Sequence, residues 1–363
     1  MVKTVSASEP ITFGIIGGGW RAEFFLRIAR ALPDRFRING MVVRDAGKGQ
    51  AIEMAWGIPT HRTPADLLAA TPLAFTVLSV PVAVAPQLLE ELAQRQMPTL
   101  TETPPAPDLA GLRAVYRLVE QGARIQVAEQ FLFQPLHAAR LALVKSGRLG
   151  AISQVQVSVA HGYHGLSILR HMLGVGFAPV TITAREFRSS LVAGPTRQGP
   201  PGVEQLANSR QLLAWLDFGD KLGVFDFAGE MYFSWIRSQR LLVRGDRGEI
   251  NNSQVRYLHD YATPISFDLR RQDAGEEGNL EGYFHRGILG GSDWLYRNPF
   301  VPARLTDEEI AIATALVKMD AYVHGGPDCY SLAEAAQDQY LALCIEQAVT
   351  SGSAVRTTSQ PWQ

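Results

Sequence analysis

Apolar and polar positions follow two alternating patterns along the first third of the chain. Short apolar runs of strand length are separated by stretches in which apolar residues recur with the period of a helix. The run from Leu73 to Ser79 is interrupted only by Thr76, which is typical of a strand buried on both faces of a parallel sheet. Strands are expected at Ile11–Ile16, Phe36–Val43, Leu73–Ser79, Thr99–Thr101 and Arg124–Ala128. Helices are expected at Glu23–Leu32, Lys48–Trp56, Ala65–Ala70, Ala85–Gln96 and Asp108–Gln121. Repeated strand–helix units with short connections predict a doubly wound parallel sheet.

The pattern changes after residue 130. A helix at Leu136–Ser146, a strand at Ile152–Ala160 and a helix at Gly165–Leu173 come first. Alternation with period two then dominates, which predicts a large, mostly antiparallel sheet. Its strands are expected at Thr181–Arg188, Gln211–Asp217, Gly223–Phe227, Gln239–Arg244 and Gln254–Tyr261. Two helices, at Asp307–Tyr322 and Leu332–Thr350, finish the chain, and Val192–Gly202 and Asp273–Gly282 are expected to be long loops.

These patterns predict an α/β protein with two domains. We expect the parallel sheet in residues 1–130 and an α/β domain with an open sheet in residues 131–363, with C-terminal helices that can pack back on the first domain.

A glycine-rich turn follows the first expected strand. Gly17, Gly19 and Ala22 form a G-x-G-x-x-A sequence between strand and helix. In a Rossmann domain the first glycine permits the tight turn, the second lets a pyrophosphate approach the backbone, and the small third residue lets helix pack on strand. The motif predicts a dinucleotide site in which Gly17, Gly19, Trp20 and Arg21 contact the cofactor.

The end of the second strand favours NADP(H) over NAD(H). An acidic residue there binds the ribose 2′-hydroxyl of NAD, and an arginine accommodates the 2′-phosphate of NADP. Val43 occupies the position of the acid, Arg44 follows it and Lys48 is nearby, while Arg21 is a further cation that could assist. The simpler alternative is a solvated basic corner.

Composition limits the possible partners and the compartment. The chain has 363 residues, 46% hydrophobic and 19% charged, with a formal net charge of −1, so no surface for nucleic acid or membrane is indicated. Cys329 and Cys344 lack the spacing of a metal or disulfide framework and are expected to be buried thiols on the C-terminal helices. Met1–Pro10 lacks the apolar core of a secretory signal, and Leu73–Ala85 is too short and too interrupted to span a bilayer. A cytoplasmic protein with a small-molecule substrate is expected.

His164 is the strongest candidate for proton transfer, because imidazole titrates near neutrality. Tyr163 beside it can donate a phenolic proton, or can simply pack at the corner between strand and helix. His171 shares a helical face with His164 and is expected to be structural. His161 and His164 form an H-x-x-H pair, but no third ligand has suitable spacing, so a metal site is not expected and His161 is assigned to substrate binding.

Further candidates follow the strands of the first domain. Glu129 and Gln130 end its last strand, where such sheets bind ligands, so Gln130 is assigned to the cofactor and Glu129 to the substrate. An ordinary polar strand end is the alternative. Ser79, Pro81 and Glu102 are expected to border the nicotinamide. The aromatic stretch Glu230–Arg237 favours sheet packing or a subunit interface over a sugar platform.

Several motifs together resemble the glucose–fructose oxidoreductase / inositol dehydrogenase / MocA family. Their order along the chain is that of the family, and the match spans nearly all of the sequence. They are the glycine-rich turn, the stretches Leu78–Pro81 and Thr101–Pro105, the sequences Gly147–Ile152 and Arg244–Ile250, and the closing helix from Ser331 to Gly352. The resemblance implies a Rossmann domain, a second domain whose sheet faces the nicotinamide, and a homodimer or homotetramer formed through that sheet.

Two positions depart from the family pattern. The resemblance implies a lysine, in an E-K-P motif, that hydrogen-bonds the reacting oxygen, but this position is Thr103. His164 fits the histidine of the family's D-x-x-x-H pair, whereas Ala160 stands where the aspartate would be. Threonine supplies no cation and alanine orients nothing, so only a neutral hydrogen bond from Thr103 could position the oxygen.

The sequence therefore predicts an NAD(P)-dependent oxidoreductase. It would transfer a hydride to or from a small polar substrate, a sugar, polyol or related carbonyl or imine, with His164 as proton relay and Tyr163 and Thr103 assisting. A nicotinamide-dependent glycosidase or imine reductase is one alternative. A dinucleotide-binding regulatory protein without catalysis is another.

Overall fold

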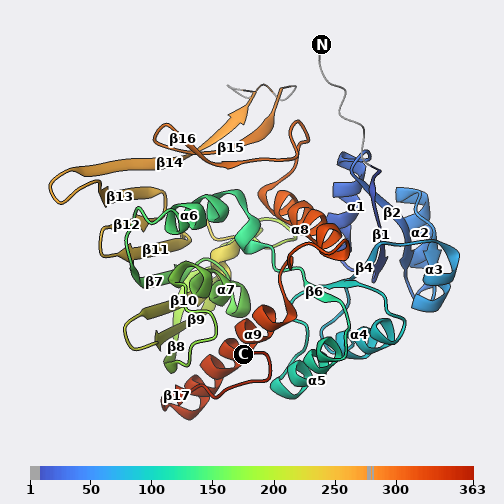
Figure 1. The fold of residues 1–363 in the computed structure, drawn as a ribbon, viewed down its shortest axis with the longest axis horizontal. Coiled ribbons are helices and arrows are strands. Elements are labelled where there is room, and N and C mark those ends of the chain that lie inside the picture. The colour runs from blue at the N-terminus through green and yellow to red at the C-terminus, as the bar shows by residue number, and fades with distance from the viewer. Residues whose placement is uncertain (1–8, 276–278, 280–281) are drawn as a thin grey trace. The chain divides into compact units, whose positions relative to one another are not determined.

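The computed structural model describes residues 9–275, 279 and 282–363. The chain divides into two compact units (Figure 1). The first unit comprises Met1–Pro135, Asp273–Arg286 and Asn298–Ala336, and the second comprises Leu136–Gln272, Gly287–Arg297 and Gln337–Gln363. Most of Met1–Pro10 and part of Asp273–Gly282, for which sequence expectations were stated, lie outside the described residues.

The first unit contains a six-stranded sheet in the order β3-β2-β1-β4-β5-β6, in which every paired strand is parallel. This confirms the predicted doubly wound Rossmann architecture. Its strands are β1 (Ile11–Ile16), β2 (Phe36–Val42), β3 (Thr60–His61), β4 (Phe75–Leu78), β5 (Thr99–Thr101) and β6 (Ile125–Val127). Its helices are α1 (Ala22–Ala31), α2 (Ala46–Trp56), α3 (Pro64–Ala70), α4 (Ala85–Gln94) and α5 (Leu109–Glu120). The two-residue strand β3 was not predicted, because so short a strand has no periodicity.

Apolar packing on both faces stabilises this sheet. All four residues of β4 are buried, as its continuous apolar run predicts. Phe13 of β1 stacks on Phe75 of β4 with ring centroids 5.5 Å apart. Helix α1 contributes Phe25 and Ile28 to the core, and both side chains are buried.

Helix α8 (Asp307–Val323) belongs to the first unit, although it lies far from α1 in the sequence. It packs against α1 and against the short 3-10 helix η1 (Phe131–Phe133), and Figure 1 shows α8 in orange-red beside the blue α1. Thr306 and Glu309 form a reciprocal capping box at its start. The first turn of α8 is acidic, with Asp307, Glu308 and Glu309.

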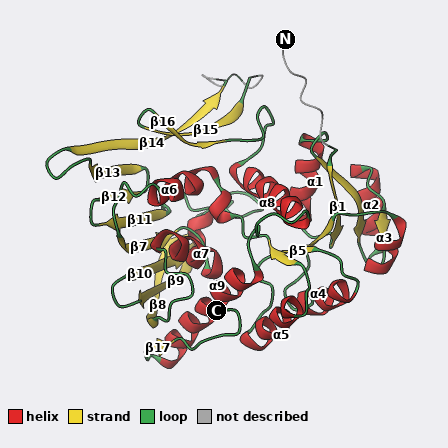
Figure 2. Cartoon of the chain, viewed as in Figure 1, coloured by secondary structure: helices red, strands yellow, loops and turns green. Residues whose placement is uncertain are grey.

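The second unit is built on an eleven-stranded sheet in the order β16-β15-β14-β13-β12-β11-β7-β10-β9-β8-β17 (Figure 2). Among the strand pairs whose register is defined, β7 and β10 are parallel and the others are antiparallel, which confirms the predicted sheet type. The strands are β7 (Ile152–Ser158), β8 (Thr181–Val192), β9 (Leu206–Asp217), β10 (Leu222–Ala228), β11 (Arg240–Gly245), β12 (Gly248–Asn251), β13 (Gln254–Leu258), β14 (Pro264–Ala274), β15 (Phe284–Gly290), β16 (Asp293–Arg297) and β17 (Val355–Arg356). The helices are α6 (Pro135–Lys145), α7 (Gly162–Leu173), α9 (Leu332–Ser351) and the 3-10 helix η2 (Gly229–Tyr232).

Several boundaries in this sheet differ from the expectations. Strand β8 extends to Val192 and strand β9 begins at Leu206, so the loop between them is 193–205. Strands β12, β14, β15 and β16 were not predicted, and Asp273 lies in β14 instead of a loop. Polar residues occupy exposed positions of β14 and β16, and cross-strand pairing sets the register of β12, β13 and β14.

Helix α7 starts three residues earlier than expected, at Gly162. Gly165 lies where a side chain would collide, because a Cβ there would come 2.6 Å from both the Ala160 carbonyl and the Phe225 ring. The glycine therefore allows the first turn of α7 to pack tightly on β10. His164 accordingly lies within this turn, not before the helix as expected.

Both cysteines are buried, but only Cys344 lies in a helix. Cys329 lies in the connection between α8 and α9, which corrects the expectation for that residue. Burial raises the pKa of the Cys329 thiol to about 12. Across the described residues, no helix has the length and apolar character needed to cross a membrane.

Candidate functional site

The glycine-rich turn joins β1 to α1 between the ends of two neighbouring strands. Gly17 has φ +118, and a Cβ there would lie 1.9 Å from the Ser79 carbonyl oxygen at the end of β4. The Gly17 amide donates to the Val42 carbonyl at the end of β2, at 3.0 Å. Only glycine fits this position, so the chain makes the tight turn that the sequence motif predicts.

The start of α1 is open to an anion. A Cβ on Gly19 would meet no atom within 4 Å, and no side chain caps the helix. Backbone N–H groups at such an end attract phosphate because the helix dipole is positive there. Trp20 is 53% exposed beside this turn and packs edge-on against Phe24.

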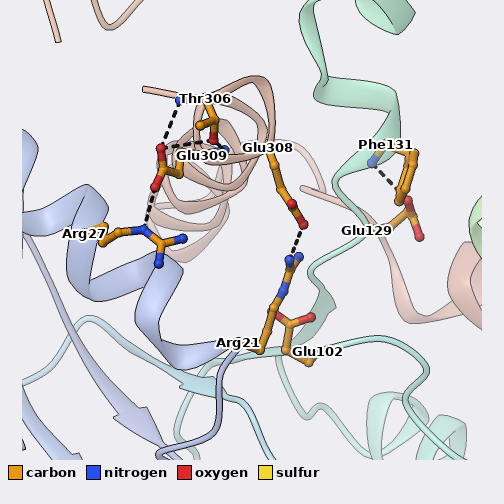
Figure 3. Close-up of polar contacts among 8 residues, drawn as sticks. All are labelled: Arg21, Arg27, Glu102, Glu129, Phe131, Thr306, Glu308 and Glu309. Carbon is orange, nitrogen blue, oxygen red and sulfur yellow. Dashed lines mark hydrogen bonds and ion pairs between the residues drawn. The ribbon is translucent and has the colours of Figure 1, made fainter. Parts of the chain in front are cut away.

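Arg21, the residue before α1, binds two carboxylates. Its Nε donates to Glu102 after β5 at 2.9 Å, and its Nη1 donates to Glu308 of α8 (Figure 3). The side chains of Arg21 and Glu102 are each only 12% exposed. Burial by itself would lower the pKa of Arg21, but the two carboxylates outweigh this effect and raise it above its usual value.

A second ion pair links the same two helices. Arg27 Nε lies 2.7 Å from Glu309 Oε1, the carboxylate of the capping box (Figure 3). Arg21 and Arg27 thus hold the start of α1 against the acidic first turn of α8. None of the sequence patterns indicated this contact, because the acids lie more than 280 positions away along the chain.

Arg21 points away from the end of β2. Its two partners lie after β5 and on α8, whereas β2 is on the opposite side of β1 from β5 in the sheet order. These two contacts occupy the Arg21 guanidinium, and its assistance to Arg44 with a ribose phosphate stays a prediction.

The end of β2 carries cations with no acidic side chain in the expected position. Val43 is buried beside the glycine-rich turn, since a Cβ on Gly18 would lie 3.3 Å from it. Arg44 and Lys48 are exposed and form no ion pair within the described part of the chain. Asp45 is the only acid nearby in sequence, and its carboxylate caps α2 by accepting from the Lys48 amide at 2.7 Å.

The carboxyl ends of β5 and β6 hold the remaining candidates of the first unit. Glu102 and Thr103 follow β5 and are half-buried, and Ser79 at the end of β4 is buried while Pro81 is exposed. Glu129 is buried after β6 and accepts a hydrogen bond from the Phe131 amide at 3.0 Å (Figure 3).

Gln130 has an unsatisfied buried oxygen. Its side chain is 4% exposed, and Oε1 has no hydrogen-bond partner among the residues that the structure describes. A buried carbonyl without a donor costs free energy, and ligand sites are a common exception to full satisfaction. Together with the open glycine-rich turn, this oxygen fits a nicotinamide dinucleotide, whose carboxamide carries the N–H groups that it lacks.

Two histidines and two tyrosines cluster in the second unit, at the start of α7. His161 Nδ1 lies 2.6 Å from the hydroxyl of Tyr232 in η2, which also accepts from the His161 amide at 3.0 Å. His161 Nε2 lies 3.2 Å from the Tyr163 hydroxyl. The His164 ring is buried, with its centroid 4.4 Å from Tyr163 and 5.0 Å from His161.

The predicted residues thus form two groups. The cofactor candidates and Thr103 surround the sheet edge of the first unit, and His161, Tyr163 and His164 cluster in the second. Tyr232 joins the histidine cluster, although the sequence favoured sheet packing or a subunit interface for its aromatic stretch. The described residues contain no set of three or more potential metal ligands.

Residues 11–129 match the model of the Gfo/Idh/MocA family, described as an oxidoreductase family with an NAD-binding Rossmann fold. No curated protein sequence matches the chain. An oxidoreductase from Agrobacterium radiobacter, solved with NAD+, L-tartaric acid and magnesium, is similar in structure with a TM-score of 0.67 at 17% identity, over 96% of this chain and 98% of that one.

Two further solved structures show the same fold. An NAD-binding oxidoreductase from Klebsiella pneumoniae has a TM-score of 0.69 at 14% identity, over 97% of this chain and 100% of its own. Levoglucosan dehydrogenase, solved with NADH and levoglucosan, has a TM-score of 0.68 at 14% identity, over 96% and 100%. The model of the Gfo/Idh/MocA oxidoreductase family with an NAD-binding Rossmann fold thus confirms the expected resemblance over residues 11–129.

Proposed function

We propose that the protein is an NAD(P)-dependent oxidoreductase that transfers a hydride to or from a small polar substrate, such as a sugar, a polyol or a related carbonyl or imine. The observation that carries the proposal is the unsatisfied Gln130 oxygen at the sheet edge that the open glycine-rich turn also borders. Solved relatives of the same fold were obtained with NADH and levoglucosan or with NAD+ and L-tartaric acid, which supports the substrate class.

The first unit would hold the cofactor. Backbone groups at Gly17, Gly19, Trp20 and Arg21 bind the pyrophosphate, and Gln130 accepts from the nicotinamide carboxamide. Ser79, Pro81 and Glu102 border the ring. When bound, the nicotinamide supplies the hydride chemistry, and the protein contributes orientation and electrostatics.

NADP(H) is the favoured cofactor in this proposal. Val43 offers no carboxylate to a ribose 2′-hydroxyl, and the exposed cations Arg44 and Lys48 suit a phosphate. The solved relatives contain NAD(H), so the preference rests on these residues of this chain alone.

His164 would move the proton that accompanies the hydride. An imidazole can take a proton from an alcohol or return one to a carbonyl near neutral pH. Tyr163, in contact with its ring, would assist, and Thr103 would hold the reacting oxygen by a neutral hydrogen bond. Glu129 and His161 would contact the substrate. Neither the glycosidase nor the regulatory alternative is favoured by any feature of the described residues.

An exposed apolar row supports a homodimer or homotetramer formed through the second sheet. Trp215 and Leu213 of β9 are 63% and 36% exposed, and Phe187 of the paired strand β8 is 55% exposed. Their spacing of two along paired strands places them on one face of the sheet. Large exposed apolar side chains gathered on one face of a sheet are typical of a protein interface.

Fluorescence titration with NADPH and NADH is the direct test, followed by a turnover screen of sugars and polyols with the oxidised nucleotides. We expect binding of at least one nucleotide and reduction of it by one substrate class. Failure of both nucleotides to bind the purified protein would contradict the proposal. Binding without turnover on any substrate would point to the regulatory alternative.

A further inference from the structure

We propose that Arg62, together with Arg44, forms the binding site of a ribose 2′-phosphate and determines selectivity for NADP(H). This inference rests on the proposed function, since it concerns the same dinucleotide site. Arg62 follows β3, a strand that sequence patterns did not predict, and its contacts are known only from the structure.

Strand pairing places Arg62 beside the selectivity position of β2. In the parallel pair of β2 and β3, Val42 lies opposite His61, and the Val43 amide donates to the His61 carbonyl at 2.9 Å. Val43 and Arg62 are the next residues along the two strands. Because both strands are parallel, the two residues lie at the same carboxyl edge of the sheet, where dinucleotide sheets bind ribose.

The guanidinium of Arg62 is held in place on one side. Its Nη1 donates to the Val43 carbonyl at 2.8 Å and to Thr60 Oγ1 at 3.1 Å. Thr60 Oγ1 in turn donates to Glu53 Oε1 at 2.6 Å. Gly49 of α2 provides the space, because a Cβ there would come 2.6 Å from Nη1.

The other side of the guanidinium remains available. Within the described residues, Nε and Nη2 of Arg62 have no hydrogen-bond partner, and the side chain is exposed. A guanidinium with two such donors matches the bidentate geometry of a phosphate. A 2′-hydroxyl needs an acceptor to be recognised, and the apolar, buried Val43 side chain offers none.

The local charge balance also favours a phosphate. Arg44, Lys48 and Arg62 contribute three cations, and Asp45 is committed to the cap of α2. Glu53 accepts two hydrogen bonds from Thr60, which are the main cause of its lowered pKa, and the charge of Arg62 contributes to the same lowering. Three cations thus stand against the two carboxylates of Asp45 and Glu53, and the remaining positive charge suits an anionic phosphate.

The test compares Arg62→Ala and Arg62→Lys with the wild type in titrations with NADPH, NADH and the fragments adenosine 2′,5′-bisphosphate and 5′-AMP. We expect the NADPH-to-NADH affinity ratio to fall about tenfold or more in Arg62→Ala, with a smaller fall in Arg62→Lys, which retains the charge but not the fork. The ratio for the two fragments should fall in parallel. Arg30→Ala is the matched control, because Arg30 also donates to a carbonyl of this region, that of Ala55, and its ratio should not change.

Three outcomes would overturn the inference. An equal loss of affinity for both nucleotides in Arg62→Ala would show that Arg62 only stabilises the contact between β2 and β3. Stronger binding of NADH than of NADPH by the wild type would exclude a binding site for the 2′-phosphate. If the wild type bound neither nucleotide, the proposed function would fail as well, whereas in the first two cases it would stand.

Discussion

Arg21 and Glu102 are joined by a 2.9 Å ion pair that ties the glycine-rich turn after β1 to the loop after β5. Glu308 of α8 binds the same guanidinium, so three segments that are distant in sequence meet at one cation. Glu102 precedes Thr103, the residue in the position of the family lysine. The pair therefore couples the expected phosphate end of the cofactor site to its expected nicotinamide end.

Replacing Arg21 by alanine should weaken both folding and nucleotide binding. The substitution leaves the Glu102 and Glu308 carboxylates without a cation beside the turn, where they would repel a pyrophosphate. We expect the free energy of unfolding to fall by about 1–3 kcal/mol and the Kd of the nucleotide to rise. Denaturant unfolding and fluorescence titration measure the two effects.

Arg27→Ala is the control for this prediction. Arg27 pairs with Glu309 but is 42% exposed, so its loss should cost less than about 1 kcal/mol. Nucleotide affinity should not change in this variant. Equal effects of the two substitutions on affinity would refute a special role for Arg21.

Substitution of Gln130 by methionine should have opposite effects on stability and binding. The change removes a buried carbonyl oxygen that lacks a partner and keeps the volume of the side chain. We expect the free energy of unfolding of the protein without nucleotide to rise by about 1 kcal/mol at most, while nucleotide affinity falls. Calorimetric unfolding with and without nucleotide separates the two; a loss of stability in the absence of nucleotide would show that the oxygen is satisfied.

His164→Asn should remove the proton relay without removing the cofactor site. We expect turnover to fall by about a hundredfold or more, with nucleotide affinity retained because His164 lies in the second unit. His171→Asn serves as control, since His171 lies on the same helix with its Nδ1 2.9 Å from the Ser167 carbonyl. Stopped-flow measurement of the hydride step in both variants is decisive, and equal losses would assign His164 a structural role.

Acidification should destabilise the protein partly through His137 of α6. Burial first, and then the charge of Arg140, lowers the pKa of His137 to about 3, and Arg140 Nη1 donates to its Nδ1 at 3.2 Å. In the unfolded state His137 binds a proton with a pKa near 6.5. The contribution of the neutral, buried His137 to stability is therefore fully present above that pH and falls as the pH drops toward 3. The slope from this group approaches about 1 kcal/mol per pH unit. His137→Gln should flatten unfolding free energy against pH in this window; an unchanged slope would assign the acid sensitivity to carboxylates.

Trp215→Arg should break the proposed assembly through the second sheet. An arginine keeps a long side chain on the exposed strand face but places a charge in any apolar contact. We expect light scattering to show the mass of a dimer or tetramer for the wild type and of a monomer for the variant. Leu258→Arg, at an exposed residue of β13 outside this row, should leave the assembly intact.

Local patterns were sufficient for five of the six strands in the parallel sheet of the first unit. Apolar runs such as Leu73–Ser79 must be buried on both faces, and Gly17 occurs where only glycine fits, so the parallel sheet and its ligand edge follow from residues close together in the chain. The helices α8 and α9 were also predicted to within one residue at each end, because their apolar periodicity is long. His164 could be selected because few residue types titrate near neutrality.

Contacts between distant segments required the tertiary structure. The pairing of Arg21 with Glu102 and Glu308, the approach of Tyr232 to His161 and the placement of Arg62 beside Val43 each join residues that no local period relates. Strand β3 is too short to have a pattern, and the register of β12, β13 and β14 is set by the strands with which they pair. The sequence alone determined which chemical groups the chain carries and which segments must be buried. Only folding decided which charges meet, because the energy of an ion pair depends on distance and burial and not on spacing along the chain.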